Sequence, residues 1–358
     1  MKKIVLTGGG TAGHVTPNIA LLPALQAAGY EIAYVGSYEG IEKKLIADFN
    51  IPYTGISTGK FRRYLDPKNF SDPFRVMKGF VEARNYLKNY QPDVVFSKGG
   101  FVSVPVVRAA ASLHIPCIIH ESDMTPGLAN KLCIPVAEKV CCNFPETMKN
   151  IPADKAVLTG SPIRAELAQG SKLAGLNMCG FTANKPVIMV IGGSLGAANV
   201  NKAVRDALPK LLEDFQVVHL CGKDKIDNLL LNTPGYKQFE YIKAELKDIF
   251  AMADIVISRA GANAICELLA LKKPNILIPL PAASSRGDQL LNAASFEAQG
   301  YSIVLNEDDI TTNLLVDKVH ELYFNRQNYV EAMSKSHQMD AVKTIMELIN
   351  AAADKKTN

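Results

Sequence analysis

The sequence predicts an α/β protein of two Rossmann-like domains, each built on a doubly wound parallel sheet, that face each other across a cleft. Short apolar runs alternate with helical patterns through both halves of the chain, which is typical of parallel sheets. The same turn, an apolar strand running into glycines that open a helix, occurs at 3–13 and at 187–197. At 358 residues the chain exceeds what one compact core usually supports. We expect domains at 1–162 and 163–339, with a C-terminal helix, about 340–358, that packs back on the first domain.

Composition narrows the class of protein. Hydrophobic residues make up 48% and charged residues 21%, which indicates a globular chain and excludes disorder as the main state. No apolar run approaches the ~18 residues of a membrane span, and the apolar stretch at 4–6 is too short for a signal peptide. We therefore expect a cytoplasmic location, with peripheral membrane contact at most. Seven cysteines without a Cys-x-x-Cys pair, and no Asp-x-Asp, predict buried thiols and no built-in metal.

Six apolar runs in the first half are expected strands: Lys3–Thr7, Glu31–Gly36, Asp93–Phe96, Pro116–His120, Lys139–Cys142 and Ala156–Thr159. Helical patterns lie between them at Ile19–Ala28, Gly40–Phe49 and Phe74–Tyr90.

The second half repeats this scheme. Its expected strands are Val187–Ile191, Gln216–Leu220, Phe239–Ile242, Asp254–Ser258, Asn275–Pro279 and Ser302–Leu305. The segment Gly170–Lys185 is expected to be a linker or variable loop, and the chain is mostly helical after Asn313. Ligands of open α/β sheets bind beyond the carboxyl ends of the strands, so both glycine turns should border a ligand site.

Both glycine turns suit phosphate, because exposed N–H groups at a helix start attract anions. Gly8-x-Gly10-x-x-Gly13 matches a dinucleotide fingerprint, but an NAD site also needs an acidic residue at the end of the second strand. Here that strand ends at Ser37, and Glu31 stands at its beginning. A nicotinamide enzyme is therefore disfavoured, and the absence of Gly-Lys-Ser/Thr disfavours a P-loop.

A carboxylate suited to ribose occurs in the second half. Glu267 lies about one turn inside a helix that opens at Gly261–Asn263, directly after a strand. It can accept hydrogen bonds from both ribose hydroxyls while the helix start faces phosphate. The alternative, a solvated surface glutamate, fits less well with the apolar residues on either side.

Seven motifs occur along the chain in a fixed order. They are Gly9-Gly10-Thr11-x-Gly13-His14-x-x-Pro17, Gly99-Gly100-Phe101-Val102-Ser103-x-Pro105, His120-Glu121, Pro162-Ile163-Arg164, Gly192-Gly193-Ser194-x-Gly196, Arg259-Ala260-Gly261-Ala262 to Glu267, and Asp288-Gln289-x-x-Asn292-Ala293. Together they resemble the UDP-N-acetylglucosamine:N-acetylmuramoyl-pentapeptide pyrophosphoryl-undecaprenol N-acetylglucosamine transferases of peptidoglycan synthesis. The resemblance implies the GT-B fold, an inverting hexosyltransferase that converts lipid I to lipid II, and a role in cell wall formation, cell shape and cell division.

The resemblance implies that the C-terminal half binds UDP-GlcNAc as a substrate, with no cofactor and no tightly bound metal. Gln289 would hold the GlcNAc hydroxyls, the backbone of Ile242 the uracil and Arg164 the leaving diphosphate. The further donor contacts would be Ser194, Ala262, Asn263, Glu267 and Asp288, together with Thr11, Ala12 and Gly13.

Three positions depart from relatives of the family. Asp288 stands where some have glutamine, so it can accept but not donate a hydrogen bond to the sugar. Asp123 stands where the family has an amide, and Phe101 replaces a tyrosine, which removes any role for a hydroxyl there.

The N-terminal half would bind the acceptor, a polyprenyl-diphosphoryl-MurNAc-pentapeptide, and Gly99, Gly100 and Ser103 are candidates for a second anion-binding turn. The attacking hydroxyl needs a base. His14 is the first candidate because it follows the glycine turn and titrates near neutrality. Glu121 competes with it, and His14 also has a purely structural reading as a capping or phosphate-binding residue.

Residues 60–80 combine basic and aromatic side chains. Lys60, Arg62, Arg63, Lys68, Arg75 and Lys78 outnumber Asp66 and Asp72. From the residues alone, inward-packed aromatics with solvated charges are the favoured reading. With the lipid-linked acceptor that the resemblance implies, docking on an anionic membrane at the cytoplasmic face is favoured instead. No nucleic-acid-binding module is present.

Two other kinds of function stay open at this point. One is a different sugar-nucleotide enzyme of the same fold, such as a glycolipid glycosyltransferase or a UDP-GlcNAc 2-epimerase, which its product would distinguish. The other is a non-catalytic nucleotide-sugar sensor, against which the presence of His14, Arg164, Glu267 and Gln289 together argues.

Overall fold

The structure is a computed structural model that describes the chain except for residues 60–67, 193–196, 283–286, 337–339 and 358. The chain divides into two compact units, each described here by itself. The N-terminal unit comprises Met1–Arg164 and Asp340–Asn358, and the C-terminal unit comprises Ala165–Met339.

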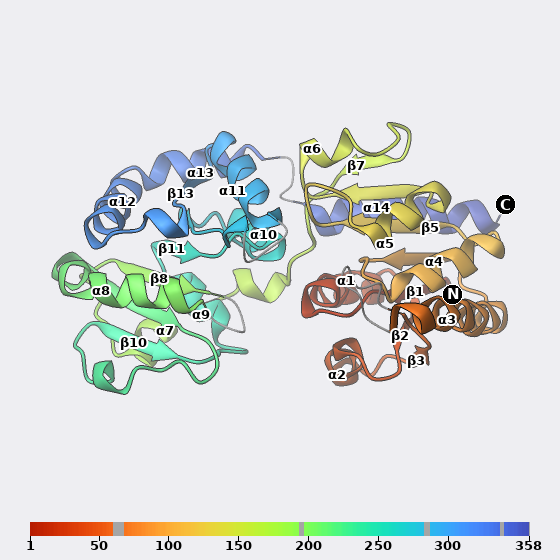
Figure 1. Ribbon diagram of the computed structural model, residues 1–358, viewed down its shortest axis with the longest axis horizontal. Helices are drawn as coiled ribbons and strands as arrows, with labels where there is room; N and C mark the ends of the chain where they lie inside the picture. The colour runs from red at the N-terminus through yellow and green to blue at the C-terminus, as the bar shows by residue number, and fades with distance from the viewer. Residues whose placement is uncertain (60–67, 193–196, 283–286, 337–339, 358) are drawn as a thin grey trace. The chain divides into compact units, whose positions relative to one another are not determined.

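The N-terminal unit contains a parallel sheet of seven strands in its described residues, in the order β3-β2-β1-β4-β5-β6-β7 (Figure 1). The strands are β1 (Lys3–Thr7), β2 (Glu31–Ser37), β3 (Tyr53–Ile56), β4 (Val94–Ser97), β5 (Cys117–Glu121), β6 (Lys139–Cys142) and β7 (Ala156–Leu158). Leu6 pairs with Tyr34 on one side and with Phe96 on the other, so β1 is an interior strand of this sheet.

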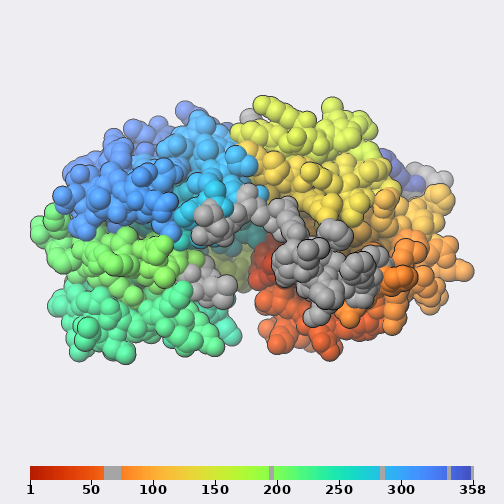
Figure 2. All heavy atoms as spheres, in the orientation of Figure 1, coloured from red at the N-terminus to blue at the C-terminus, as the bar shows by residue number. Residues whose placement is uncertain are grey.

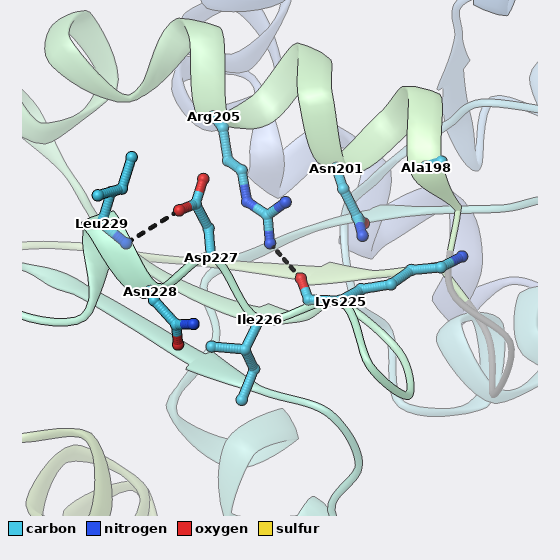
Figure 3. A pocket seen from close by; sticks show the side chains of 8 residues that line it. All are labelled: Ala198, Asn201, Arg205, Lys225, Ile226, Asp227, Asn228 and Leu229. Atoms are coloured by element: carbon cyan, nitrogen blue, oxygen red, sulfur yellow. Dashed lines mark hydrogen bonds between the residues drawn. The ribbon is translucent and has the colours of Figure 1, made fainter.

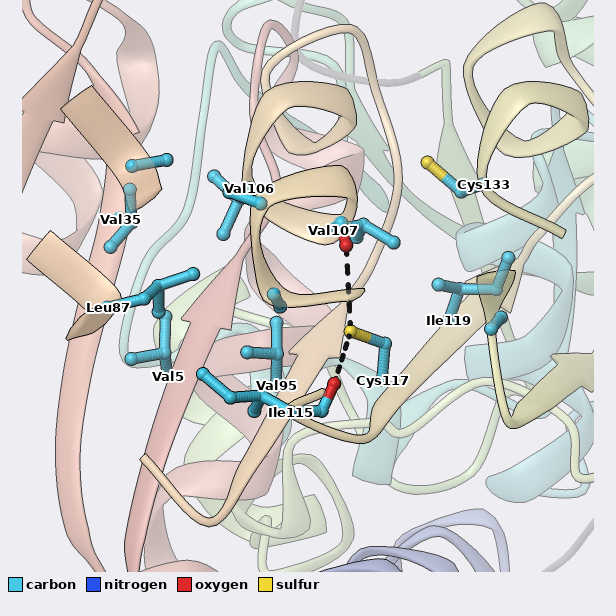
Figure 4. Close-up of a cluster of buried hydrophobic side chains, with 14 of the residues drawn as sticks. Val5, Val35, Leu87, Val95, Val106, Val107, Ile115, Cys117, Ile119 and Cys133 are labelled. Carbon is cyan, nitrogen blue, oxygen red and sulfur yellow. Dashed lines mark hydrogen bonds between the residues drawn. The ribbon is translucent and has the colours of Figure 1, made fainter. Parts of the chain in front are cut away.

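Helices cover both faces of this sheet. They are α1 (Thr16–Ala27), α2 (Ile41–Ile46), α3 (Lys68–Tyr90), α4 (Ser103–Ser112), α5 (Leu128–Cys133), α6 (Pro145–Met148) and α14 (Ala341–Thr357), with the 3₁₀ turns η1 (Ala12–His14), η2 (Ala47–Phe49) and η3 (Ile134–Val136). Successive strand residues point to opposite faces, so each face has its own core. Val5 packs with α3, α4 and α5 (Figure 4), whereas Ile4 and Leu6 pack with α1 and α14.

Helix α14 is separated in sequence from the unit on which it packs. Its Ile345, Ile349 and Ala353 are fully buried in the core that α1 contributes to. Tyr30 also donates a hydrogen bond to the side chain of Asn350 over 2.8 Å. Figures 1 and 2 show the blue residues of this helix among the red to yellow residues of the N-terminal unit.

The C-terminal unit repeats the architecture with a six-stranded parallel sheet in its described residues, in the order β10-β9-β8-β11-β12-β13. Its strands are β8 (Val187–Ile191), β9 (Gln216–Leu220), β10 (Tyr236–Phe239), β11 (Ile255–Ser258), β12 (Asn275–Leu277) and β13 (Ser302–Val304). Its helices are α7 (Lys172–Cys179), α8 (Ala198–Asp214), α9 (Leu246–Met252), α10 (Ala262–Ala270), α11 (Asp288–Ala298), α12 (Thr312–Phe324) and α13 (Arg326–Ser334), with the 3₁₀ turns η4 (Ala165–Ala168), η5 (Asn228–Leu230) and η7 (Glu307–Asp309). The prediction of two α/β domains with parallel sheets is confirmed.

Three local predictions were wrong. The segment 170–185 is not a linker, because Ser171 caps α7 by accepting a hydrogen bond from the Ala174 amide, and Gly180 ends that helix at φ 69°. Strand β3 was missed because it is short and contains a glycine. Strand β10 begins three residues earlier than expected, and the buried Ile242, which suggested a strand, lies in the loop after it.

The predicted burial of the cysteines is confirmed. All seven are free thiols and all are buried. Cys117, for example, lies in the core beneath α4 and donates to the carbonyl oxygens of Ile115 and Val107 (Figure 4).

Candidate functional site

The first glycine turn lies at the carboxyl edge of the N-terminal sheet. Strand β1 ends at Thr7, and the turn leads through η1 into α1. Because β4 is the neighbour of β1, the glycines that follow β4 lie beside this turn. At Gly100, which has φ 84°, a Cβ atom would lie 2.3 Å from the Gly9 carbonyl oxygen and 3.1 Å from Nδ1 of His14. The structure therefore brings together His14, the first turn and Gly100.

His14 is half-buried, and its Nδ1 lies 3.0 Å from the Thr11 hydroxyl oxygen. Burial, and next the positive charge of Lys98, lower the pKa of His14 to about 4, against the opposing effects of the Gly9 backbone and Glu42. The imidazole is thus neutral near pH 7 and able to accept a proton. Thr11 and Ala12 next to it are exposed, and Gly13 is half-buried.

The carboxylate of Glu121, at the end of β5, is buried, and both of its oxygens accept hydrogen bonds from neighbouring groups. One oxygen accepts a hydrogen bond from the Asp123 amide over 3.0 Å; the other accepts from the Gly127 amide over 3.0 Å and from the Asn130 side chain over 2.9 Å. Both oxygens of this carboxylate are thus engaged in closing the loop between β5 and α5. This geometry favours His14 as the base.

Ser103 and Gly99 differ from Gly100 in their surroundings. The Ser103 hydroxyl is buried and donates to the Gly100 carbonyl oxygen over 3.0 Å, within the first turn of α4. Gly99, at φ 91°, packs against the side chain of Asn130. Among these acceptor-side candidates, Gly100 is thus the one in direct contact with the turn of His14.

Two buried charged residues near His14 were not among the predicted site residues. Lys98 follows β4 and is 1% exposed, and Glu42, in α2, is fully buried. A lysine directly between an apolar strand and two glycines was the available signal for the first. Nothing in the sequence around Glu42 distinguishes it from a surface glutamate at a helix start.

The predicted donor residues of the C-terminal unit lie at the carboxyl ends of its strands. Ala262, Asn263 and Glu267 are half-buried in the first two turns of α10, which follows β11. Asp288 and Gln289 begin α11 after Gly287.

Two hydrogen bonds fix the start of α11 against the neighbouring segments. The Asn292 side chain donates to the Ala260 carbonyl oxygen over 3.2 Å, which ties α11 to the turn before α10. The Gln289 side-chain oxygen accepts from the Leu280 amide over 3.1 Å. The structure therefore brings the candidates on α10 and α11 together.

The remaining predicted donor contacts are Ser194, Ile242 and Arg164. Ser194 lies outside the described residues, as does the second glycine turn from Gly193 to Gly196. Ile242 is buried three residues beyond the end of β10, beside the exposed Tyr241. Arg164 is half-buried and is the last residue of the N-terminal unit before the chain enters η4.

A cavity of about 500 Å³ opens beside the start of α8 (Figure 3). Its lining comes from α8 and from the loop after β9: Ala198, Asn201, Arg205, Lys225, Ile226, Asp227, Asn228 and Leu229. Arg205 donates to the Lys225 carbonyl oxygen over 2.6 Å and to the Gln238 side chain over 2.9 Å, so its guanidinium fixes the loop. None of these residues was a predicted site residue.

The described residues contain no group of three or more His, Cys, Asp or Glu side chains arranged to hold a metal ion. Among the same residues, no helix combines the length and apolarity that crossing a bilayer requires.

Comparison with curated proteins identifies the family. A UDP-N-acetylglucosamine--N-acetylmuramyl-(pentapeptide) pyrophosphoryl-undecaprenol N-acetylglucosamine transferase from Lachnospira eligens is 65% identical over 98% of this chain and 99% of its own. The chain belongs to this transferase family. A transferase of the same name from Clostridium botulinum strain Hall is 58% identical over 98% of this chain and 99% of its own. The N-terminal domain of glycosyltransferase family 28 matches residues 4–142, and its C-terminal domain matches 187–349.

Solved structures agree with this transferase family. The chain superposes on MurG from Acinetobacter baumannii with a TM-score of 0.77 and 28% identity, over 98% of this chain and all of that one. It superposes on a UDP-GlcNAc 2-epimerase from Neisseria meningitidis with a TM-score of 0.67 and 15% identity, over 97% of this chain and 99% of that one, which shows a shared fold alone. The GT-B fold implied by the sequence motifs is thus confirmed.

Proposed function

We propose that this chain transfers GlcNAc from UDP-GlcNAc to the 4-hydroxyl of MurNAc in undecaprenyl-pyrophosphoryl-MurNAc-pentapeptide. The observation that carries this assignment is the 65% identity to a curated transferase over nearly the whole length of both chains. The product is a β-linked disaccharide on the lipid diphosphate, formed with inversion at the anomeric carbon. The activity places the chain in cell wall synthesis, and thereby in the maintenance of cell shape and in cell division.

We assign a role to individual residues in each unit. In the N-terminal unit, the neutral imidazole of His14 takes the proton from the attacking hydroxyl as the new C–O bond forms. In the C-terminal unit, Glu267 accepts hydrogen bonds from the ribose and Gln289 donates to the GlcNAc ring. The bond to the diphosphate breaks as UDP leaves, and we assign its stabilisation to Ser194 and Arg164.

The decisive assay is transfer of labelled GlcNAc from UDP-GlcNAc to a short-chain polyprenyl-diphosphoryl-MurNAc-peptide. We expect His14→Ala to lower kcat by about 10²–10⁴-fold while UDP-GlcNAc binding is retained. His114→Asn, at an exposed histidine of φ 55°, is the matched control and should leave kcat unchanged. A wild-type chain that formed no disaccharide lipid, but produced a glycolipid or free epimerised sugar, would overturn the assignment.

The same assay distinguishes the two candidate bases. If Glu121 were the base, Glu121→Gln would abolish transfer in a folded protein as completely as His14→Ala. We expect it instead to lower stability, since its carboxylate joins two backbone amides and Asn130.

We further propose that donor binding needs no tightly bound metal. The charge of the leaving diphosphate would be met by Arg164, Ser194 and the amides at the starts of helices. Titration of UDP-GlcNAc into the chain before and after EDTA treatment tests this proposal. Loss of donor binding in EDTA, restored by a divalent cation, would refute it.

The third proposal is peripheral docking on an anionic membrane at its cytoplasmic face, through residues 60–80. Of this segment, 60–67 lie outside the described residues. On the following part of α3, Phe74, Met77 and Val81 are 78%, 63% and 52% exposed. Their spacing puts them on one face of the helix, whereas Ala83 and Leu87 are buried in the core. Exposed apolar residues flanked by the exposed Arg75 and Lys78 suit a lipid surface.

Vesicle co-sedimentation tests this docking. We expect weaker binding to anionic vesicles for Phe74→Ser/Met77→Ser and for a variant with Lys60, Arg62, Arg63 and Arg75 changed to Gln. A variant with Lys202 and Lys223 changed to Gln, which neutralises exposed lysines of the C-terminal unit, is the control. Full vesicle binding by both test variants would refute the docking surface.

A further inference from the structure

The turn that carries His14 rests on a buried carboxylate. Glu42, in α2, accepts hydrogen bonds at one oxygen from the amide and the hydroxyl of Ser37, over 2.9 and 2.5 Å. Its other oxygen accepts from the Gly10 amide over 3.2 Å. The carboxylate thereby connects the end of β2 to the first glycine turn.

The side chain of Glu42 is closely surrounded by glycine backbone. A Cβ atom at Gly9, Gly36 or Gly40 would lie 2.5, 2.8 or 2.2 Å from the nearest atom of the Glu42 side chain. Three glycines from the turn, from β2 and from the start of α2 therefore enclose one buried carboxylate. Removing its hydrogen bonds would leave the turn without its support on this side.

A buried cation lies on the other side of the same turn. The Lys98 amide donates to the Thr7 carbonyl oxygen over 2.9 Å, and a Cβ atom at Gly8 would lie 3.3 Å from Cβ of Lys98. Its ammonium donates to Nδ1 of His120 over 3.1 Å and to the Ser122 hydroxyl.

The protonation state of His120 follows from this network. Its Nε2 lies 2.9 Å from the Gly160 carbonyl oxygen and donates to it, so Nδ1 is left as the acceptor for Lys98. Burial and the charge of Lys98 hold the pKa of His120 well below its usual range. His120 is therefore neutral, and the cation in this network is Lys98.

We propose that Glu42 and Lys98 are positioning residues that hold the turn carrying His14 and act on its imidazole in opposite electrostatic directions. Lys98 disfavours the protonated form of His14, in addition to the larger effect of burial. Glu42 stabilises the imidazolium that forms when His14 takes the proton. The kinetic consequence rests on the proposed function, whereas the electrostatic consequence does not.

The other groups around His14 carry no competing charge. The Tyr34 hydroxyl donates to the Gly8 carbonyl oxygen over 2.7 Å, and burial raises the pKa of this phenol, so it stays neutral. His120 is neutral, and the Thr11 hydroxyl does not titrate. Burial makes the largest contribution to the low pKa of His14, and Lys98 and Glu42 are the two charges that modify it.

NMR titration of the full chain, with the His14 resonances assigned through His14→Asn, measures the effect directly. We expect Lys98→Met to raise the pKa of His14 by about one pH unit and Lys98→Arg, which keeps the charge, to leave it unchanged. Lys88→Met, at an exposed lysine of α3, is the control. Because His14 titrates at about pH 4, Glu42→Gln is measured in the Lys98→Met background, where we expect it to reverse the rise.

Each outcome of this experiment decides the inference. A pKa of His14 that rises in Lys98→Met and falls again on adding Glu42→Gln supports the inference. An unchanged pKa of His14 in folded variants, or changes of the same sign, overturn it. Failure of Lys98→Met, Lys98→Gln and Glu42→Gln to fold would also overturn it, in favour of a purely structural role.

The kinetic measurement separates this inference from the proposed function. If His14 is the base, the acid limb of the pH profile of kcat/KM moves with the pKa measured by NMR. If the pKa of His14 measured by NMR changed but the acid limb of kcat/KM did not, the electrostatic inference would hold and His14 would not be the base.

Discussion

Gly100 tests whether the contact between the two glycine turns of the N-terminal unit matters for activity. In Gly100→Ala, the new Cβ would lie 2.3 Å from the Gly9 carbonyl oxygen, whereas an ordinary contact begins at 3.4 Å. The turn before His14 must therefore move by about 1 Å, and a displacement of that size near reacting groups costs about 100-fold in rate. We expect kcat to fall by about that factor, because the displaced turn carries His14.

The control for this prediction is Gly29→Ala. Gly29 has φ 75°, close to the 84° of Gly100, but a Cβ atom there would meet no atom within 4 Å. Both variants carry the left-handed backbone cost of about 1–2 kcal/mol, partly offset by the lower entropy of the unfolded chain. Overpacking at Gly100 adds about 1–3 kcal/mol more.

The assays are GlcNAc transfer and thermal unfolding of both variants. For a unit of this size, the extra cost at Gly100 corresponds to a Tm lower by about 2–4 °C per kcal/mol. If Gly100→Ala and Gly29→Ala gave the same kcat, the two turns would not need their close approach for catalysis and the reasoning would be wrong.

Three further outcomes follow from the structure. Ser171→Ala removes the cap of α7 and should cost about 1 kcal/mol, seen as a lower Tm, whereas Ser334→Ala in α13 should change it little. Burial lowers the pKa of His219 to about 3, whereas its pKa in the unfolded chain is about 6.5. The contribution of the neutral imidazole to stability is therefore complete above about pH 6.5 and is lost as the pH falls towards 3. Urea midpoints should drop over that range, and should drop less in His219→Gln. The seven thiols are buried, and burial raises the pKa of Cys141 and Cys142 to about 12. Ellman's reagent at pH 8 should therefore label the native protein only after denaturant is added. Rapid labelling without denaturant would contradict the burial of the thiols.

Much of the fold could be predicted because it depends on short-range patterns. Apolar runs such as Val187–Ile191 and Lys139–Cys142 were located with their correct bounds, since a strand buried on both faces is continuously apolar. The pattern failed where burial and strand pairing diverge. Ile242 is buried without being in a strand, and the short β3 contains a glycine.

The candidate site could be predicted only in part. Glycine turns and a histidine after them are local signals, so His14 could be predicted as a site residue from its neighbours in sequence. The hydrogen bonds of Glu121 could not be predicted, because its partners Gly127 and Asn130 are brought to it by the loop after β5. Such hydrogen bonds depend on which segments of the chain come into contact, and local sequence patterns do not contain this information.

The sequence by itself determined the class of fold and the family, because these depend on periodicity and on motifs a few residues long. The tertiary structure alone decided which charges surround His14. Glu42 is 32 residues from Gly10 in the chain, and Lys98 is 22 residues from His120, yet hydrogen bonds join both pairs. Parallel strands bring their carboxyl ends to one edge of a sheet, so residues far apart in sequence share one buried, low-dielectric environment in which two charges can control a third group.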